Sequence, residues 1–502
     1  MNQTFTQLKT YLDKSTAYTT ALALIQWDIE TLAPKKAAEQ TGKMVGILSD
    51  LYFNSFINPE VKALLEQLET KEEQETLTIE EKAIVRELRR AYEQLETVPS
   101  NEYSAYSELT MKSSVIWAKA REEDDYEAFA PVLKEIIEYN KRFASYRNTT
   151  ETDTYNILLG DYEPSLKVKD LDEFFNLLKE KLVPLIHRVA ERQEAIDDSF
   201  NYQNFPVEKQ KEFCEFIAQY IGFDLERGVI AESAHPFTLN LHNKDVRITN
   251  HFYEENLISA ILSIIHEGGH GIYELNIADE ITQTLVGTGA SMAVHESQSR
   301  FYENMIGKNQ AFWEPIYGEL QKTFPEQLNH VSLEAFVRGI NKSVPGLIRT
   351  EADELTYSMH VLIRYEIEKM IFAGEITVDQ LPEVWNKKYE EYLGVTPKNN
   401  ASGVLQDTHW AWGNFGYFPS YAVGSAVAAQ IYYHMKKEMD FEGLLREGKL
   451  EVIKEYLKEH IHQYGMVYDM NQLLERLTGE SFNPNYYVTY LTEKYVALYE
   501  LS

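Results

Sequence analysis

The segment 257-LISAILSIIHEGGHGIYEL-275 decides how the rest of the chain is interpreted. Its first half, 257-LISAILSII-265, is apolar on nearly all sides, which predicts a buried helix. Glycine inside a helix costs about 1 kcal/mol relative to alanine, so the adjacent Gly268 and Gly269 need a reason. We expect that either a bound molecule lies close across this helix or a second helix crosses tightly behind it, since both approaches need missing side chains.

Two histidines of this segment have the spacing of metal ligands. His266 and His270 are four residues apart, so on a helix both rings leave the same face and can reach one cation. Glu267 lies beside them and completes the pattern H-E-x-x-H, in which the histidines hold Zn²⁺ and the glutamate activates a water molecule. The alternative is a pair of ordinary histidines, but the buried setting makes unpartnered polar side chains costly.

A hydrolytic zinc site needs a third protein ligand and one open position. The segment 294-VHESQSRFYEN-304 offers Glu296, 26 residues after His270, and a second helix crossing the first could deliver it. His295 competes for this role, but neighbouring residues on a helix point about 100° apart, so only one of them should ligate. We favour Glu296, because two histidines and one carboxylate suit an activated water.

Composition limits the remaining possibilities. The 502 residues are 44% hydrophobic and 12% aromatic, as in a globular protein with a large core. The formal charge of −31, from 48 basic and 79 acidic residues, weighs against binding nucleic acid or an anionic membrane. Cys214 is the only cysteine, so an intramolecular disulfide is excluded. No signal peptide or membrane span is visible, and we expect a cytoplasmic protein.

Glycine positions and helix signals predict a mainly α fold. Only four of the 24 glycines precede residue 228, which favours long helices over residues 1–225 and places the metal and substrate motifs in residues 226–502. Short strands are expected within 236–249, where alternation and β-branched residues occur. We expect one domain over residues 1–502, resembling a large helical bundle, with two lobes around a cleft and a small β-sheet near the metal motif.

Three helices carry recognisable end signals. Thr78 and Glu81 form a capping-box pattern before residues 79–98, and Pro382 and Gly394 bracket another helix. Asp170 is expected to cap residues 171–196, with Pro184 bending that helix. The apolar positions of this last helix recur every three or four residues, at Leu171, Phe174, Phe175, Leu178, Leu182, Leu185 and Val189.

Six blocks of sequence follow one another in order along the chain: 235-HPF-237, 245-DVRIT-249, 266-HEGGH-270, 295-HESQSRFYEN-304, 348-IRTEAD-353 and 403-GVLQDTHW-410. Together they resemble the carboxypeptidase Taq family of metallocarboxypeptidases. The resemblance implies that residues 1–502 form a single peptidase domain of helical fold with a long central groove. It also implies a homodimer, one divalent metal and broad-specificity removal of C-terminal residues from peptides. The metal is usually zinc in that family, and cobalt often substitutes.

A carboxypeptidase must recognise a free α-carboxylate, and the arginine fork suits that anion. Arg349 is the lead candidate, favoured by the resemblance, although it could instead pair with Glu351, Asp353 or Glu354. Asp353 could orient Arg349 or a metal-ligating histidine.

Two further residues could contact the substrate. Arg247 is the second candidate for the carboxylate, but Asp245 is two residues away on a predicted strand and could simply pair with it. His235, which precedes Pro236, is either a substrate contact or a histidine fixed by a turn.

The stretch 403-GVLQDTHWAWGNFGYFPSY-421 places aromatic residues around one histidine. Peptidases of this type need a donor besides the metal for the tetrahedral oxyanion, and we expect His409 and Tyr421 to serve, with Tyr417 as the alternative tyrosine. A buried core histidine is the competing interpretation. The remaining aromatic residues of the stretch should line the groove or fill the core: Trp410, Trp412, Phe415 and Phe418.

These residues give one expected mechanism. Zn²⁺ on His266, His270 and Glu296 makes a water acidic, Glu267 accepts its proton during attack on the last peptide bond, and Arg349 restricts cleavage to the C-terminus. An endo-acting or dipeptide-releasing zinc oligopeptidase is the alternative within peptidases. A non-catalytic helical binding protein that keeps the motif as structure is the alternative from another class.

Overall fold

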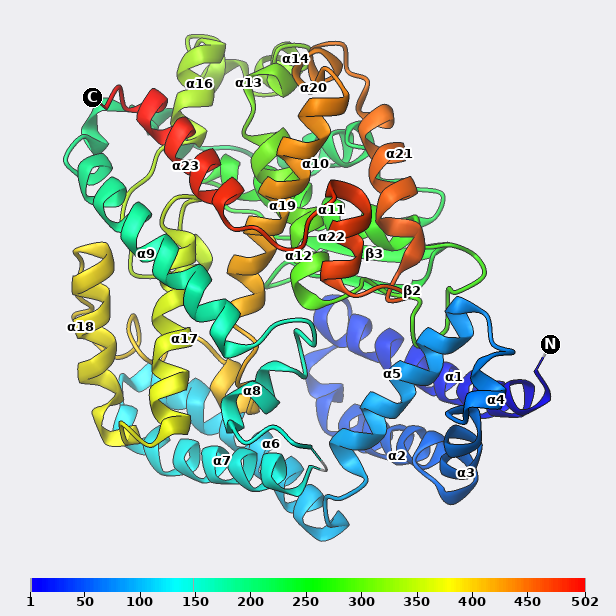
Figure 1. The fold of residues 1–502 in the computed structure, drawn as a ribbon. Coiled ribbons are helices and arrows are strands. Elements are labelled where there is room, and N and C mark those ends of the chain that lie inside the picture. The colour runs from blue at the N-terminus through cyan, green and yellow to red at the C-terminus, as the bar shows by residue number, and fades with distance from the viewer. Residues whose placement is uncertain (1, 148, 502) are drawn as a thin grey trace. The chain divides into compact units, whose positions relative to one another are not determined.

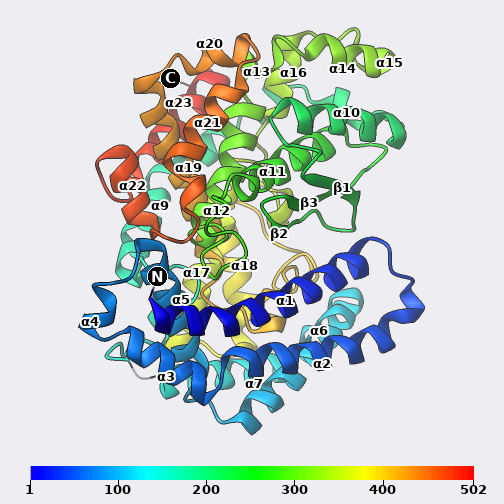
Figure 2. The same ribbon diagram turned by 90° about the vertical axis from the view of Figure 1, so that its right-hand side faces the viewer.

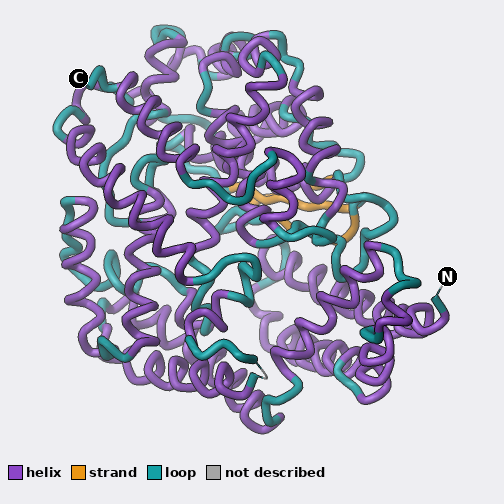
Figure 3. The backbone as a smooth tube through the Cα atoms, in the orientation of Figure 1, coloured by secondary structure: helices purple, strands orange, loops and turns teal. Residues whose placement is uncertain are grey.

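Helices make up most of the computed structural model, which describes residues 2–147 and 149–501 (Figures 1 and 3). The described residues contain one sheet, whose three strands follow the order β1-β3-β2. The predicted fold class, mainly α with a small sheet, is confirmed. None of the described helices has the length and apolar character that a membrane span requires.

The chain forms two compact units, each assembled from three separate stretches. Unit 1 contains Met1–Tyr92, Asp198–Ile340 and Ile431–Ser481. Unit 2 contains Glu93–Asp197, Asn341–Gln430 and Phe482–Ser502. The divisions near residues 92 and 430 fall inside helices α5 (Ile79–Leu95) and α19 (Pro419–Glu438). That residues 1–502 act as one peptidase domain stays a prediction.

Unit 1 contains the sheet and the helix of the histidine motif. Strand β3 (Asp245–Asn250) lies in the middle, parallel to β1 (Gly228–Glu232) and antiparallel to β2 (Thr238–His242). Helix α11 (Leu257–Leu275) packs on β2 and β3 (Figure 2). The sequence predicted β2 and β3 but missed β1, whose side chains are all at least partly exposed and therefore give no apolar alternation.

The N-terminal helices of unit 1 enclose a hydrophobic core. Leu8 of α1, Leu65 of α3 and Leu88 of α5 are fully buried there, together with Val286 from the segment that follows α11. The predicted capping box of α5 is confirmed, because the Thr78 amide donates to Glu81 and the Glu81 amide donates to Thr78. The other helices of this unit are α1 (Gln3–Thr31), α2 (Ala38–Phe56), α3 (Pro59–Leu68), α4 (Lys71–Gln74), α10 (Val207–Tyr220), α12 (Met292–Arg300), α13 (Gln310–Trp313), α14 (Tyr317–Thr323), α15 (Pro325–Leu328), α16 (Leu333–Ile340), α20 (Phe441–Arg446), α21 (Leu450–His460) and α22 (Met470–Thr478).

Unit 2 is built from long helices, and their ends test two further predictions. Helix α18 (Leu381–Leu393) has Pro382 in its first turn and ends at Gly394 with φ 68°, as expected. Helix α9 (Val168–Ala190) begins three residues earlier and ends six residues earlier than predicted, so Asp170 is not its N-cap. The Asp170 carboxylate instead accepts from the Lys167 amide from within the first turn, at 2.8 Å, which is the reciprocal half of a capping box.

The apolar pattern of α9 is confirmed, since all seven predicted positions are buried, and Pro184 lies inside the helix without ending it. The remaining helices of unit 2 are α6 (Ser100–Glu123), α7 (Tyr126–Tyr146), α8 (Thr154–Leu159), α17 (Tyr357–Ala373) and α23 (Asn485–Leu498).

Candidate active site

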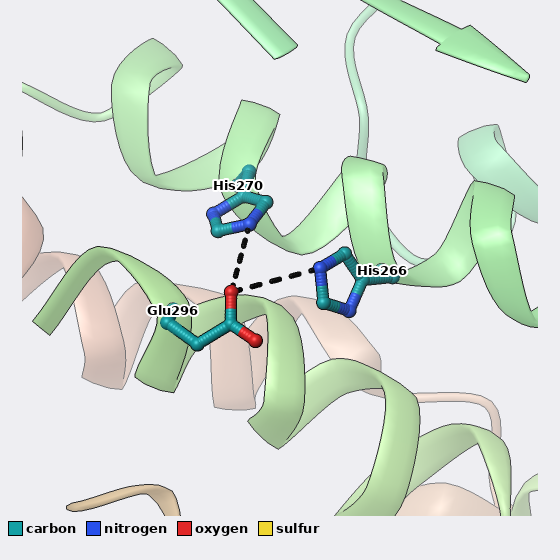
Figure 4. Close-up of side chains that lie close together, drawn as sticks. All are labelled: His266, His270 and Glu296. Atoms are coloured by element: carbon teal, nitrogen blue, oxygen red, sulfur yellow. Dashed lines mark ion pairs between the residues drawn. The ribbon is translucent and has the colours of Figure 1, made fainter. Parts of the chain in front are cut away.

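Two neighbouring helices of unit 1 bring together three side chains that could hold a metal ion (Figure 4). His266 and His270 project from one face of α11, and Glu296 reaches them from α12. Glu296 Oε2 lies 3.8 Å from His266 Nε2 and 3.5 Å from His270 Nε2. One donor atom from each residue lies within 4.8 Å of the others, and we call these three residues the metal cluster.

Glycine lets α12 approach α11 this closely. A Cβ atom built on Gly269 would lie 2.8 Å from Ser299 Cα and 2.9 Å from the Gln298 carbonyl oxygen, and neither backbone atom can move cheaply. A Cβ on Gly268 would meet Ile221 Cδ1, the flexible end of a side chain, at 2.6 Å. At Gly269 the structure therefore supports a crossing helix as the reason for glycine, whereas Gly268 faces only the Ile221 side chain.

A second carboxylate and an arginine orient the metal cluster. Glu303 Oε2 lies 2.8 Å from His266 Nδ1, and Arg300 donates to both Glu296 and Glu303 at 2.7 and 3.1 Å. Glu303 belongs to a π-helical segment, Phe301–Gly307, that continues α12. Such contacts fix the ring orientation of a ligating histidine and leave its other nitrogen facing the cation.

His295, the competing third ligand, contacts the metal cluster from outside. Its Nδ1 lies 2.5 Å from His270 Nδ1, and its Nε2 lies 2.6 Å from Glu274 Oε1. His295 thus approaches Nδ1 of His270, whereas Glu296 lies on the side of Nε2.

The protonation states of the metal cluster suit a cation. Burial lowers the pKa of His270 to about 3, so this ring is neutral and can offer a lone pair. Burial would raise the pKa of Glu296, but Arg300 and His266 outweigh it and hold the carboxyl ionised. Burial would also lower the pKa of His266, but the carboxylates of Glu296 and Glu303 outweigh it. The pKa of His266 is therefore raised, and this position favours a positive charge. Two imidazoles and one carboxylate therefore fit a divalent metal such as zinc.

Glu267 lies beside the metal cluster without belonging to it. Its carboxylate is buried and accepts a hydrogen bond from the Thr238 hydroxyl of β2 at 2.7 Å. Burial raises its pKa, which moves this carboxyl toward the range of a general base at neutral pH.

In unit 2, two arginines share one aspartate. Arg349 donates through Nε and Nη2 to Asp407 Oδ1 at 3.0 and 2.8 Å, and Arg364 donates through Nε to Asp407 Oδ2 at 2.6 Å. Burial would raise the pKa of Asp407, but the two guanidinium groups outweigh it and hold the carboxyl ionised. We call these three residues the arginine cluster, and two cations on one anion leave one positive charge unbalanced among them.

The predicted oxyanion donors lie against the arginine cluster. His409 Nε2 is 3.2 Å from the Tyr421 hydroxyl, and the Arg349 guanidinium carbon is 4.9 Å from the centre of the Tyr421 ring. Burial and the neighbouring Arg349 lower the pKa of His409 to about 3, so this histidine is neutral. The Tyr417 ring lies 5.3 Å from that of His409. The structure thus brings Arg349, His409 and Tyr421 together.

Sequence reasoning missed the partners of Arg349. Asp407 lies in the block 403–410 and Arg364 lies outside all the blocks, and no spacing rule connects either residue to Arg349. Two of the acidic residues expected as alternative partners of Arg349 have other contacts. Glu354 contacts Lys494 at 2.5 Å, and Asp353 accepts from the amides of Val344 and Leu355.

Arg247 and His235, the other two predicted substrate contacts, have partners nearby in the sequence. Arg247 donates two hydrogen bonds to Asp245, both at 2.9 Å, and its guanidinium lies over the Trp27 ring. His235 is exposed, and its carbonyl accepts from Ser233 in a turn. Among the aromatic residues after His409, Trp410, Phe415 and Phe418 are buried as expected, whereas Trp412 is 46% exposed.

Two histidines and a glutamate on packed helices, with a further glutamate between the histidines, define a metallopeptidase type of site. The family model of the carboxypeptidase Taq (M32) metallopeptidases matches residues 7–495. Carboxypeptidase 1 of Bacillus subtilis is 42% identical over 491 residues, which cover 98% of this chain and 97% of that protein.

Solved structures agree over the full length. The Pyrococcus furiosus carboxypeptidase has a TM-score of 0.94 at 34% identity, with 99% of each chain covered. The M32 carboxypeptidase of Deinococcus radiodurans has a TM-score of 0.95 at 30% identity, over 99% of this chain and 100% of that one. The chain belongs to the M32 carboxypeptidase Taq family and is a metallocarboxypeptidase.

Proposed function

We propose that this carboxypeptidase uses zinc at the metal cluster to release single C-terminal amino acids from peptides with broad specificity, and that cobalt can replace the zinc. The observation that carries the proposal is the approach of His266, His270 and Glu296 to one another beside the buried Glu267. A divalent cation held there would supply a Lewis acid and make a water molecule acidic enough to attack at neutral pH.

Glu267 is the proposed general base and acid. It takes a proton from the attacking water and returns it to the amine of the departing residue. Its raised pKa favours both transfers, because a carboxyl that is too acidic cannot hold the proton between them. The Thr238 hydroxyl keeps the carboxylate in one orientation.

The arginine cluster is the proposed binding site for the α-carboxylate of the substrate. Arg349 is the lead contact, because it is less completely buried than Arg364 and belongs to a group with an unbalanced positive charge. In an acidic protein of net charge −31, such local positive charge is what an anionic terminus requires. Arg247 is the weaker candidate, because Asp245 already accepts from its guanidinium in a fork.

His409 and Tyr421 are the proposed hydrogen-bond donors to the oxyanion of the tetrahedral intermediate. A neutral histidine and a tyrosine hydroxyl can each donate one hydrogen bond as negative charge develops. The homodimer implied by the family resemblance is also proposed, and light scattering coupled to gel filtration tests it.

One assay tests the proposal. A tripeptide with a free C-terminus and the same peptide amidated at that end are incubated with the enzyme before and after removal of metal by a chelator, and again after addition of Zn²⁺ or Co²⁺. We expect cleavage of the free acid alone, loss with chelator and recovery with either metal. Full cleavage of the amidated peptide would instead support the endo-acting or dipeptide-releasing alternative.

A further inference from the structure

Glu368 of α17 is a fully buried carboxylate with no part in the proposed reaction. Its Oε1 accepts from the Trp410 indole at 2.7 Å, and its Oε2 accepts from the Gly416 amide at 3.0 Å and the Tyr155 hydroxyl at 2.7 Å. Burial raises its pKa to about 7 despite these three donors. A buried carboxyl is costly, and its three bonds indicate that it holds particular segments together.

Two of those donors belong to the loop that carries His409. Trp410 follows His409 directly, and Gly416 lies at the other end of the turn. Within the loop, the Asn414 amide donates to the His409 carbonyl at 2.9 Å, so the chain folds back on itself. Glu368 therefore holds both ends of residues 409–416, which begin with a 3₁₀ turn over His409–Trp412 and which we call the His409 loop.

The third donor attaches the His409 loop to α8. Tyr155 belongs to α8, and Gly416 packs against the end of the same helix with φ +85°. A Cβ on Gly416 would lie 2.8 Å from the Leu159 nitrogen, so no side chain fits there. The carboxylate of Glu368 is thus the point at which α8, α17 and the His409 loop meet through hydrogen bonds.

We propose that Glu368 is a positioning residue that sets the orientation of His409 toward the oxyanion. The inference rests on the proposed role of His409 and extends it to the residue that holds its loop. The neutral imidazole can donate usefully only from a narrow range of positions, and a displacement of 1 Å can lower a rate by about 100-fold. Loosening the loop should therefore slow the chemical step more than it weakens substrate binding.

The experiment compares two replacements of Glu368 with one matched control. Glu368→Gln keeps the volume and one acceptor oxygen, and Glu368→Met removes every acceptor. Glu366→Gln is the control, since Glu366 lies on the same helix and contacts Lys179, Lys388 and Tyr392 instead of the His409 loop. We expect kcat to fall ~10-fold for the Gln variant and ~100-fold for the Met variant, with KM changed less than about threefold. The control should keep kcat within about twofold.

A spectroscopic signal separates positioning from a general loss of structure. The six tryptophans are replaced by 5-fluorotryptophan, and Trp410→Phe identifies the ¹⁹F resonance of Trp410. That resonance should shift in Glu368→Gln and stay in place in Glu366→Gln. Unchanged kcat in both Glu368 variants would overturn the inference, and so would an equal fall of kcat in the Glu366 control. If Glu368→Met does not fold, the kcat of the near-isosteric Glu368→Gln alone decides between these outcomes.

His409→Phe, which keeps an aromatic ring but has no donor, is assayed in parallel to separate this inference from the function on which it rests. Normal kcat in His409→Phe overturns the oxyanion assignment, and with it the inference that Glu368 acts through His409. A fall in kcat for His409→Phe, combined with normal kcat in both Glu368 variants, overturns only the positioning role.

Discussion

The metal cluster of unit 1 and the arginine cluster of unit 2 suit ligands of opposite charge. The metal cluster joins one ionised carboxylate to two histidines, of which His270 is neutral, and this set of donor atoms suits a cation. The arginine cluster joins two cations to one carboxylate, and its excess positive charge suits an anion. The side chains of each cluster are buried or partly buried and tied by hydrogen bonds, so each cluster is arranged before its ligand arrives.

The two clusters also differ in how the chain builds them. His266 and His270 come from successive turns of one helix, and Glu296 comes from the next helix along the chain. Arg349 and Asp407 are 58 residues apart, the first at the start of a short 3₁₀ helix, Arg349–Glu351, and the second in a loop. The metal cluster is built from a local motif and can therefore be predicted from the sequence, whereas the arginine cluster depends on tertiary packing. Separate substitutions in each cluster test whether the two clusters have separate roles.

The largest effect is expected at the metal cluster. Glu267→Gln removes the proposed base but leaves His266, His270 and Glu296 in place, so kcat should fall by ~10³-fold or more while the metal stays bound. Activity on the free-acid peptide and metal content by mass spectrometry measure the two effects. Substantial activity in the metal-loaded variant would show that another group moves the proton.

The next largest effect is expected when Arg349, the proposed carboxylate contact in the arginine cluster, is replaced. Arg349→Met should lower kcat/KM on a free-acid peptide by ~10²- to 10³-fold, because a charge-assisted contact to the carboxylate is lost and Asp407 loses a partner. Metal affinity should not change. Arg247→Met is the matched control, and a larger loss there than in Arg349→Met would reverse the order of the two candidates.

The same contrast explains what the sequence could and could not predict. H-E-x-x-H needs only helical periodicity. The choice of Glu296 over His295 needs only the angle between neighbouring residues, which lets one of them ligate, and the suitability of two histidines and one carboxylate for an activated water. Asp407 and Glu368 could not be connected to Arg349 and His409 in this way, because neither pair has a fixed spacing within one element. Strand β1 was missed for a related reason, since its pairing with β3 comes from tertiary contacts and not from an apolar pattern.

A smaller effect is expected from the groups that orient the metal cluster. Glu303→Gln weakens the contacts to His266 and Arg300, and should lower zinc affinity by ~10- to 100-fold. Glu274→Gln is the comparison, because Glu274 reaches His270 only through His295 and should matter less. Competition with a fluorescent chelator measures both affinities, and equal values for Glu303→Gln and the unmodified enzyme would contradict the orienting role.

The smallest effect is expected at the contact between α11 and α12. Gly269→Ala places a methyl group against the backbone of α12 and should lower the free energy of unfolding by ~1 to 3 kcal/mol, as overpacking does. Gly268→Ala should cost less, because Ile221 can rotate away and alanine is the better helix former. Urea unfolding of the metal-free proteins compares them without the stabilisation that a bound ion adds. If both variants lost the same stability, close contact with α12 would not be what requires glycine at position 269. If Gly269→Ala alone lost stability and also bound zinc more weakly, the spacing of the two helices would be what sets the distance from Glu296 to the histidines.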